Sequence, residues 1–244
     1  MRALVTTALA LSLLACGSAE EKKRKKDAAD KAMMEAETKA RDEADAKAAK
    51  AAIEKATGEC DAKKAEGCLA LGRIHFDGKG VPKDAKLGLG FFMKACDLKS
   101  KDGCRTWAQQ ETDGKTKLKA LSALCDAGDA DGCIQGGALA DELVKAGQLE
   151  EPKKLNDRPA LQLLAKACAL GGAIGCTARG VALINDDPRL AVDALTKGCD
   201  LGEPTACFQL SVMLAEGKGV KKKDPDKAAA AKKKACDAGL KDAC

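Results

Sequence analysis

The chain of 244 residues contains no tyrosine, one tryptophan, four phenylalanines and one histidine. With so few aromatic side chains, its core must consist mainly of alanine and leucine, and the aromatic anchors that dominate tight peptide binding are scarce. The single histidine, His75, excludes a multi-histidine metal site. We expect His75 to occupy an aromatic position of the fold rather than to act alone as a base.

Common catalytic and ligand-binding motifs are missing as well. No serine is followed by a lysine three residues later, so the S-x-x-K nucleophile motif is absent. Gly78–Gly80 and Gly217–Gly219 lack the rest of a phosphate-binding fingerprint and predict turns between helices. Asp126, Asp129 and Asp131 lack the spacing and the closing glutamate of a calcium loop. We therefore predict no catalytic residues, no cofactor and no metal.

Cysteine, in contrast, is abundant, and all but one of the 13 cysteines fall into pairs separated by eight positions. On one continuous helix, eight residues would place the two Cα atoms roughly 12 Å apart, beyond the ~7 Å limit of a disulfide. Each pair can therefore close only if the chain reverses between its cysteines. The C-x7-C spacing also differs from that of zinc sites. The predicted disulfides are Cys60–Cys68, Cys96–Cys104, Cys125–Cys133, Cys168–Cys176, Cys199–Cys207 and Cys236–Cys244.

Glycine is frequent within these cysteine pairs, where the reversal is required. It tolerates the left-handed backbone conformation that ends many helices. The predicted unit is therefore a helix, a tight turn and a second helix, closed by a disulfide. The glycines expected to allow the reversal precede the second cysteine or lie in mid-turn: Gly67, Gly103, Gly132, Gly175, Gly128, Gly171, Gly202 and Gly239.

The first cysteines of the pairs recur at intervals of 29 to 43 residues, which indicates an array of helical hairpins. Asp84, Asp187 and Asp224 are placed to cap helix starts, and Asp157 nearly repeats this arrangement. We predict an all-α fold, a right-handed solenoid of disulfide-stapled helix-turn-helix repeats, over residues 58–244. A small residue four positions after each second cysteine predicts close helix crossings at Gly72, Ala108, Gly137, Gly180 and Ser211.

The N-terminus indicates export. Residues 1–15 have a basic start and an apolar run too short to span a bilayer, which is typical of a signal peptide. Leu13–Cys16 resembles the lipobox of bacterial lipoproteins, and Cys16 is the cysteine left over from the pairing. We expect lipidation of Cys16, and Gly17 indicates an outer-membrane lipoprotein facing the periplasm or the cell surface. An ordinary secretory signal with an incidental cysteine is the alternative.

Residues 16–57 are rich in alanine, lysine, glutamate and aspartate and contain no proline. This composition favours a lipid-anchored charged helical stalk or linker, either one extended helix or partly disordered, with a weak coiled coil as a further alternative. The net charge of the whole chain is only +5. Lysines 221–223 and 232–234 suit an anionic surface or simply solubilise the end of the array. Without aromatic stacking platforms, we expect no nucleic-acid binding.

Two segments, LALGRIHFDGKGVPKDAKLGLGFFMKAC at 69–96 and FQLSVMLAEGKGVKKKDPDKAAAAKKKAC at 208–236, resemble the tetratricopeptide-like Sel-one-like repeat. With its C-x7-C pairs, the chain is similar to the cysteine-rich Hcp-type secreted proteins. The resemblance implies a cell-envelope interaction scaffold that binds an envelope or secreted protein or peptide on its concave face. A peptidoglycan-related ligand is left open. The alternative is an Hcp-type penicillin-binding protein or weak β-lactamase, so any enzymatic activity would be that of a β-lactamase-like hydrolase.

Overall fold

The computed structural model describes residues 3–244, with side chains from Glu21 onward. The predicted signal peptide, residues 1–15, and the lipidation site Cys16 lie outside the fully described residues and stay predictions. The chain divides into two units, one ending at Glu54 and the other running from Lys55 to Cys244, and each is described by itself.

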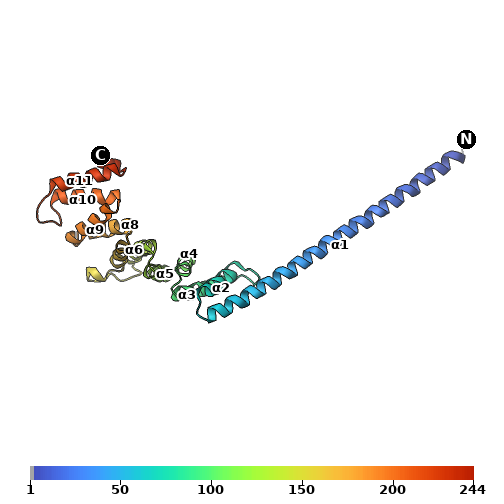
Figure 1. Cartoon of the computed structure of the whole chain (residues 1–244), viewed down its shortest axis with the longest axis horizontal. Coiled ribbons are helices and arrows are strands. Elements are labelled where there is room, and N and C mark those ends of the chain that lie inside the picture. The colour runs from blue at the N-terminus through green and yellow to red at the C-terminus, as the bar shows by residue number, and fades with distance from the viewer. Residues whose placement is uncertain (1–2) are drawn as a thin grey trace. The chain divides into compact units, whose positions relative to one another are not determined.

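All regular elements of the described chain are helices (Figure 1). Their bounds are α1 Ala3–Asp61, α2 Ala65–Asp77, α3 Ala85–Asp97, α4 Lys101–Gln110, α5 Gly114–Asp126, α6 Ala130–Lys145, η1 Leu155–Asp157, α7 Pro159–Ala169, α8 Ala173–Leu183, α9 Pro188–Asp200, α10 Pro204–Glu216, α11 Pro225–Asp237 and η2 Lys241–Ala243, where η marks a 3-10 helix.

The N-terminal unit is the greater part of α1. Its side chains from residue 21 to 48 are exposed, including Met33 and Met34, so this part of the helix packs against nothing in its own unit. Pairs of opposite charge one turn apart, such as Lys25 and Glu21 at 2.7 Å, support it instead. Helix α1 continues to Asp61 and therefore passes through the predicted domain boundary at Gly58. Within the fully described residues, no helix is sufficiently long and apolar to cross a membrane.

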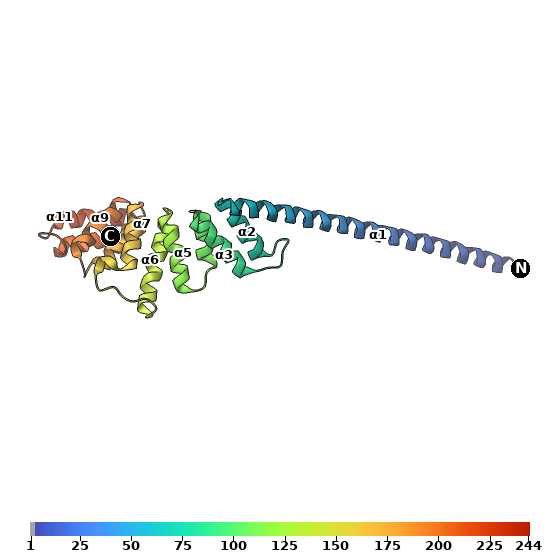
Figure 2. The ribbon, with the colours of Figure 1, turned by 90° about the horizontal axis from the view of Figure 1, so that it is seen from below.

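In the second unit, helices pair into hairpins, from α2 with α3 to α10 with α11 (Figure 2). Helices that come first in their hairpins contact one another, as α6 and α8 do, and so do helices that come second, such as α5 and α7. We call these two sets the first-helix layer (α2, α4, α6, α8 and α10) and the second-helix layer (α3, α5, α7, α9 and α11). The prediction of an all-α solenoid of helical repeats is confirmed.

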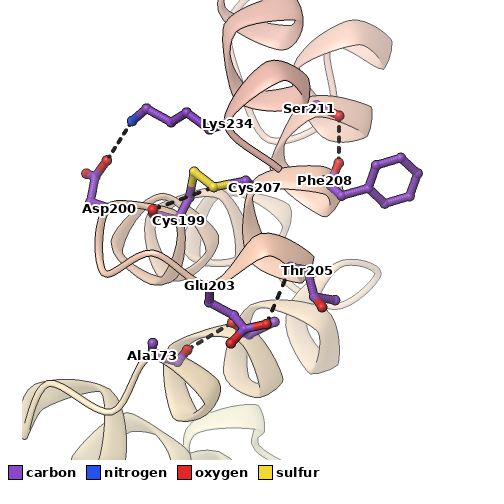
Figure 3. Close-up of a disulfide and its surroundings, with 10 residues drawn as sticks. Ala173, Cys199, Asp200, Glu203, Thr205, Cys207, Phe208, Ser211 and Lys234 are labelled. Atoms are coloured by element: carbon purple, nitrogen blue, oxygen red, sulfur yellow. Dashed lines mark hydrogen bonds and ion pairs between the residues drawn. A yellow bond between two sulfur atoms is a disulfide. The ribbon is translucent and has the colours of Figure 1, made fainter. Parts of the chain in front are cut away.

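All six predicted disulfides are formed, with Cα–Cα distances of 4.4 to 5.0 Å. They do not close the α2–α3 type of hairpin. The last, Cys236–Cys244, joins α11 to the residue after η2. Four others lie at the short turns between hairpins and join the second helix of one to the first helix of the next, as Cys199 at the end of α9 joins Cys207 in α10 (Figure 3). The first disulfide joins α1 to α2 in the same way. The disulfides therefore fix the step from repeat to repeat.

The mid-turn glycines behave as predicted, but those before the second cysteine do not. The third residue after each first cysteine has positive φ, from 83° to 96° for the four glycines and 58° and 68° for Lys63 and Lys99. The other predicted turn glycines, Gly67, Gly103, Gly132 and Gly175, lack positive φ and lie in the first turn of the following helix. The prediction that these four permit the reversal is wrong.

Those four glycines instead provide space between the two disulfide-linked helices. A Cβ on Gly175 would lie 2.5 Å from the Cβ of Ala167, the residue before Cys168. In the next copy the glycine precedes the first cysteine and the alanine precedes the second. There, a Cβ on Gly198 would lie 2.9 Å from the Cβ of Ala206. The last pair has a methyl group on both sides, and its Cα–Cα distance is 5.0 Å against 4.4 to 4.6 Å elsewhere.

The small residues four positions after the second cysteine are all buried. A Cβ on Gly180 would lie 2.6 Å from Cγ of Leu195 and 3.2 Å from the carbonyl oxygen of Ala191, so α8 and α9 cross closely. At Gly137, the corresponding Cγ of Leu164 is 3.0 Å away. In these two hairpins a leucine from the second helix packs onto the backbone of the first, and in the α2–α3 hairpin Phe92 takes this place over Gly72.

Ion pairs repeat along the second-helix layer. A lysine two positions before a first cysteine contacts the aspartate that follows the first cysteine of the preceding repeat, as Lys234 contacts Asp200 at 3.3 Å (Figure 3). Lys166 and Asp126 form the same contact at 2.6 Å. Such exposed pairs contribute at most about 1 kcal/mol each. This contact accounts for three of the five aspartates that follow a first cysteine, Asp61, Asp126 and Asp200.

Aspartate caps the helices at Asp84, Asp187 and Asp224, where the side chain accepts the backbone N–H three residues later. Asp157 does not follow this pattern. It lies in η1, and Arg158, the N-cap residue of α7, forms no side-chain cap. The prediction that Asp157 nearly repeats this cap is therefore wrong. Helix α7 begins at Pro159, so the residue in the cap position is Arg158 and not Asp157.

Exchanging a glycine and an alanine across a disulfide tests the packing rule. Gly175→Ala should destabilise the chain by about 1 to 3 kcal/mol, because the added methyl overlaps Ala167. The double variant Ala167→Gly/Gly175→Ala should recover part of that loss, since it reproduces the arrangement of Gly198 and Ala206. Urea unfolding of the oxidised single and double variants measures the coupling. Strictly additive losses would contradict the rule.

Candidate binding surface

The first-helix layer carries two grooves between successive helices. One lies between α4 and α6 over α5, has a volume of about 430 Å³ and is mainly polar. The other lies between α6 and α8 over α7, has a volume of about 450 Å³ and is mainly apolar. A larger depression of about 910 Å³ runs beside Met34, but α1 alone forms it, so it has no opposing wall. The two interhelical grooves are therefore the better candidates for a binding surface.

The polar groove is organised by Arg105 and Asp129. Nη2 of Arg105 lies 2.6 Å from Oδ2 of Asp129, and Nη1 lies 3.0 Å from Asp102. Oδ1 of Asp129 also accepts the backbone N–H of Gly132 at 2.8 Å and so caps α6. The groove is lined by Arg105, Ala108, Gln109, Lys117, Leu121, Leu124, Asp129, Asp131 and Gln135.

These contacts set the charge state of Asp129. Burial raises the pKa of Asp129, but the N–H of Gly132 and the guanidinium of Arg105 together outweigh it, so the pKa lies below the ordinary 3.8. The carboxylate is therefore ionised at neutral pH and is already occupied by its own neighbours. Gln109 and Gln135, both exposed, are the uncharged polar groups this groove offers to a partner.

The apolar groove is open because its walls carry small side chains. It is lined by Ile134, Gly137, Ala138, Asp141, Leu164, Ala178, Val181 and Ala182. Leu164 is buried and forms the floor, whereas Val181 is 46% exposed on the rim. An exposed aliphatic rim around a concave apolar floor is typical of a surface that receives a side chain from another molecule.

A charged region adjoins the apolar groove. A neighbouring cavity of about 370 Å³ shares Asp141 and Ala182 with it and adds Lys145, Glu151 and Arg158. Arg158 is engaged, with Nη2 3.1 Å from Glu151 and Nη1 2.7 Å from Asp186. Asp141 is exposed and forms no ion pair with any described residue. Asp141 is thus the acidic group available to a ligand in the apolar groove.

The residues singled out in the sequence lie elsewhere. His75 stacks on Phe91, with ring centroids 5.5 Å apart. The disulfides lie at the turns, and no cluster of potential metal ligands occurs in the part of the chain described in full. Sequence reasoning missed both grooves. The available signal was the set of small aliphatic residues on α6 and α8, namely Ile134, Ala138, Ala178, Val181 and Ala182.

The Sel1 repeat family profile matches residues 65–100, 146–172 and 204–240. The chain therefore contains Sel1 repeats. The first and last of these stretches cover the hairpins α2–α3 and α10–α11, and the middle one covers η1 and α7. In the structure, α4–α5 and α8–α9 form hairpins of the same kind although the profile does not match them.

One known structure shows the same fold, and two further proteins are similar to parts of this chain. A protective antigen of uropathogenic Escherichia coli with an SLR fold superposes with a TM-score of 0.50 at 21% identity, over 82% of this chain and 43% of that one. The Helicobacter pylori cysteine rich protein B gives a TM-score of 0.40 at 29% identity, over 54% and 92%. Cytochrome c oxidase assembly factor 7 of Xenopus tropicalis is 34% identical over 124 residues, 46% of this chain and 51% of that protein. The chain thus spans about half the length of this relative.

Two substitutions at Asp129 separate its capping role from its charge. Asp129→Ala should cost about 1 to 2 kcal/mol, whereas Asp129→Asn retains a good cap and should cost less than about 1 kcal/mol. Because the folded-state pKa is lowered, the charge stabilises the fold above the ordinary pKa and its contribution is lost as pH falls through the lowered value. Urea unfolding should therefore show the wild-type advantage over Asp129→Asn disappearing in acid. An advantage that persists there would contradict this role.

Proposed function

We propose that this protein is an exported scaffold that binds a segment of another protein in the apolar groove between α6 and α8. The observation that carries the proposal is the groove itself: about 450 Å³ with Leu164 at its floor and Val181 on its rim. Repeat proteins display variable surfaces on a regular framework and use them to bind other chains. The printed name of the Xenopus tropicalis relative, an assembly factor, supports a protein partner.

The groove defines the chemistry of the partner. Its apolar walls suit a large aliphatic side chain, whose burial would contribute roughly 1.5 to 3 kcal/mol. Asp141 at its end suits a basic group beside that side chain. One such anchor gives weak binding on its own. Gln109 and Gln135 in the neighbouring polar groove extend the contact by hydrogen bonds, so the partner is a segment of several residues rather than a small molecule.

The disulfides and the N-terminus support a location in the cell envelope. Six disulfides in one chain indicate an oxidising compartment. The lipobox-like Leu13–Cys16 supports a lipid anchor at Cys16, and Gly17 supports the outer membrane of the cell envelope. The scaffold would then act on envelope or secreted proteins.

Filling the groove tests the proposed function. Peptides selected from a displayed random library against the full chain should share a large aliphatic residue next to lysine or arginine. Ala138→Trp and Ala182→Trp, both at exposed positions in the groove, should weaken these peptides by about tenfold or more, which corresponds to ~1.4 kcal/mol. Titration calorimetry with the selected peptides measures the loss.

The same substitution in the other layer is the control. Ala169→Trp, exposed at the end of α7, should leave affinity unchanged. Asp141→Lys should shift selection from basic toward acidic neighbours of the aliphatic residue. Peptides without a shared motif, or peptides equally weakened by Ala169→Trp, would overturn the proposal.

The lipid anchor has a separate test. Wild-type protein produced in a bacterium with lipoprotein processing should enter the detergent phase on phase separation and carry the mass of acyl chains on Cys16. Cys16→Ser should enter the aqueous phase, because one residue accounts for the whole anchor. A wild-type protein recovered in the aqueous phase without added mass would favour the ordinary secretory signal instead.

A further inference from the structure

Almost the entire net charge of the chain lies in its last repeat. Residues 216–244 contain nine lysines against five acidic residues, a surplus of four within a net charge of +5 for the whole chain. The remaining 215 residues are therefore close to neutral. The surplus lies on the loop between α10 and α11 and on α11 itself.

The corresponding loop of the first repeat provides a contrast. There, Lys79 pairs with Asp77 at 3.0 Å, and Nζ of Lys83 lies 5.8 Å from the centre of the Phe76 ring. In the last repeat, residues 221–223 are three exposed lysines that form no ion pair with any described residue. The lysines of this loop therefore interact with neighbouring side chains in the first repeat, whereas in the last repeat lysines 221–223 have no acidic partner among the described residues.

The loop that carries these lysines, residues 217–224, is called the lysine loop, and the preceding repeat holds its backbone in place. Gly217 and Gly219 both have φ of 79°, and a Cβ on Gly219 would overlap the carbonyl group of Pro188. Nζ of Lys218 donates to Oδ1 of Asn185 at 2.9 Å, and Val220 packs against the core. The loop is thus attached to the preceding repeat and presents the lysines in a defined place.

The nearest acidic group is already occupied. Asp224 caps α11 by accepting the N–H of Lys227 at 3.1 Å, and its other oxygen lies 3.2 Å from Nζ of Lys227. These hydrogen bonds, the backbone one first, lower the pKa of Asp224. Its carboxylate is therefore directed to the helix start and to Lys227, and it forms no ion pair with the three loop lysines.

The residue types select the kind of partner. Residues 216–244 contain neither arginine, which recognises single carboxylates and phosphates by paired hydrogen bonds, nor any aromatic residue that would stack on a base. Clustered lysines without these groups suit a surface with many anionic groups. We propose that Lys221, Lys222 and Lys223 bind the phosphate headgroups of an anionic phospholipid membrane. The proposal is independent of the apolar groove.

Vesicle binding tests this assignment. In the full chain with Cys16→Ser, which removes any lipid anchor, binding should be detectable on phosphatidylglycerol-containing vesicles and absent on pure phosphatidylcholine. Each lysine near an anionic surface contributes roughly a fivefold gain in affinity. Lys221→Gln/Lys222→Gln/Lys223→Gln should therefore weaken binding about 100-fold in a sedimentation assay. Added salt should weaken the parent chain further, because exposed charges are screened.

A triple variant with equal loss of charge is the control. Lys86→Gln/Lys115→Gln/Lys119→Gln on α3 and α5 should reduce affinity less than about threefold, since these exposed lysines lie at least three repeats away. Equal losses in the two triple variants would show a response to net charge alone and overturn the proposal. So would binding that is lost only when the basic run at residues 22–26 is neutralised, or binding to soluble polyglutamate but not to the vesicles.

Discussion

The disulfide-closed turn between repeats is the constraint on which the rest of the structure depends. It holds two Cα atoms 4.4 to 5.0 Å apart, so the residues before the two cysteines face each other at a distance that rarely admits two side chains. The chain-entropy model gives each nine-residue loop about 2.5 kcal/mol. A chain with one tryptophan and four phenylalanines has less apolar area to bury, and the covalent link offsets that shortage at every step of the array.

The disulfides and the buried glycines determine which surface is free to vary. They occupy the turns and the interface between the two helices of each hairpin, as Gly180 does beneath Leu195. The outward positions of the first-helix layer have no such packing role. Between α4 and α6 these positions are polar, and between α6 and α8 they are small and aliphatic. Neighbouring grooves built on one framework thus differ in chemistry without any change in fold.

The sequence predicted the features that depend on spacing along the chain. Cysteines eight residues apart require a reversal, and an aspartate before a proline marks a helix start at Asp187 and Asp224. Sequence reasoning failed where the role of a residue depends on a contact with a residue on another helix. Gly175 appeared to be a turn residue because it lies near one, yet its role depends on Ala167 opposite it. The aspartate after the cysteine had no assignable role until Lys234 was found beside Asp200, 34 residues away. The grooves depend on helices two elements apart, so the small aliphatic residues of α6 and α8 do not by themselves show that a groove lies between them.

The two proposed surfaces lie on different repeats, which matters for how they would act together. The apolar groove is formed by α6, α7 and α8, and the lysines lie on α11 and the loop before it. The lysine loop contacts the neighbouring α8–α9 hairpin through Lys218 and Gly219, but their partners Asn185 and Pro188 do not line the groove. Contact with a membrane at the last repeat would therefore leave the groove open to its partner. Because each disulfide fixes one repeat against the next, the last repeat would hold the protein at a membrane while the groove formed by α6, α7 and α8 binds a partner protein.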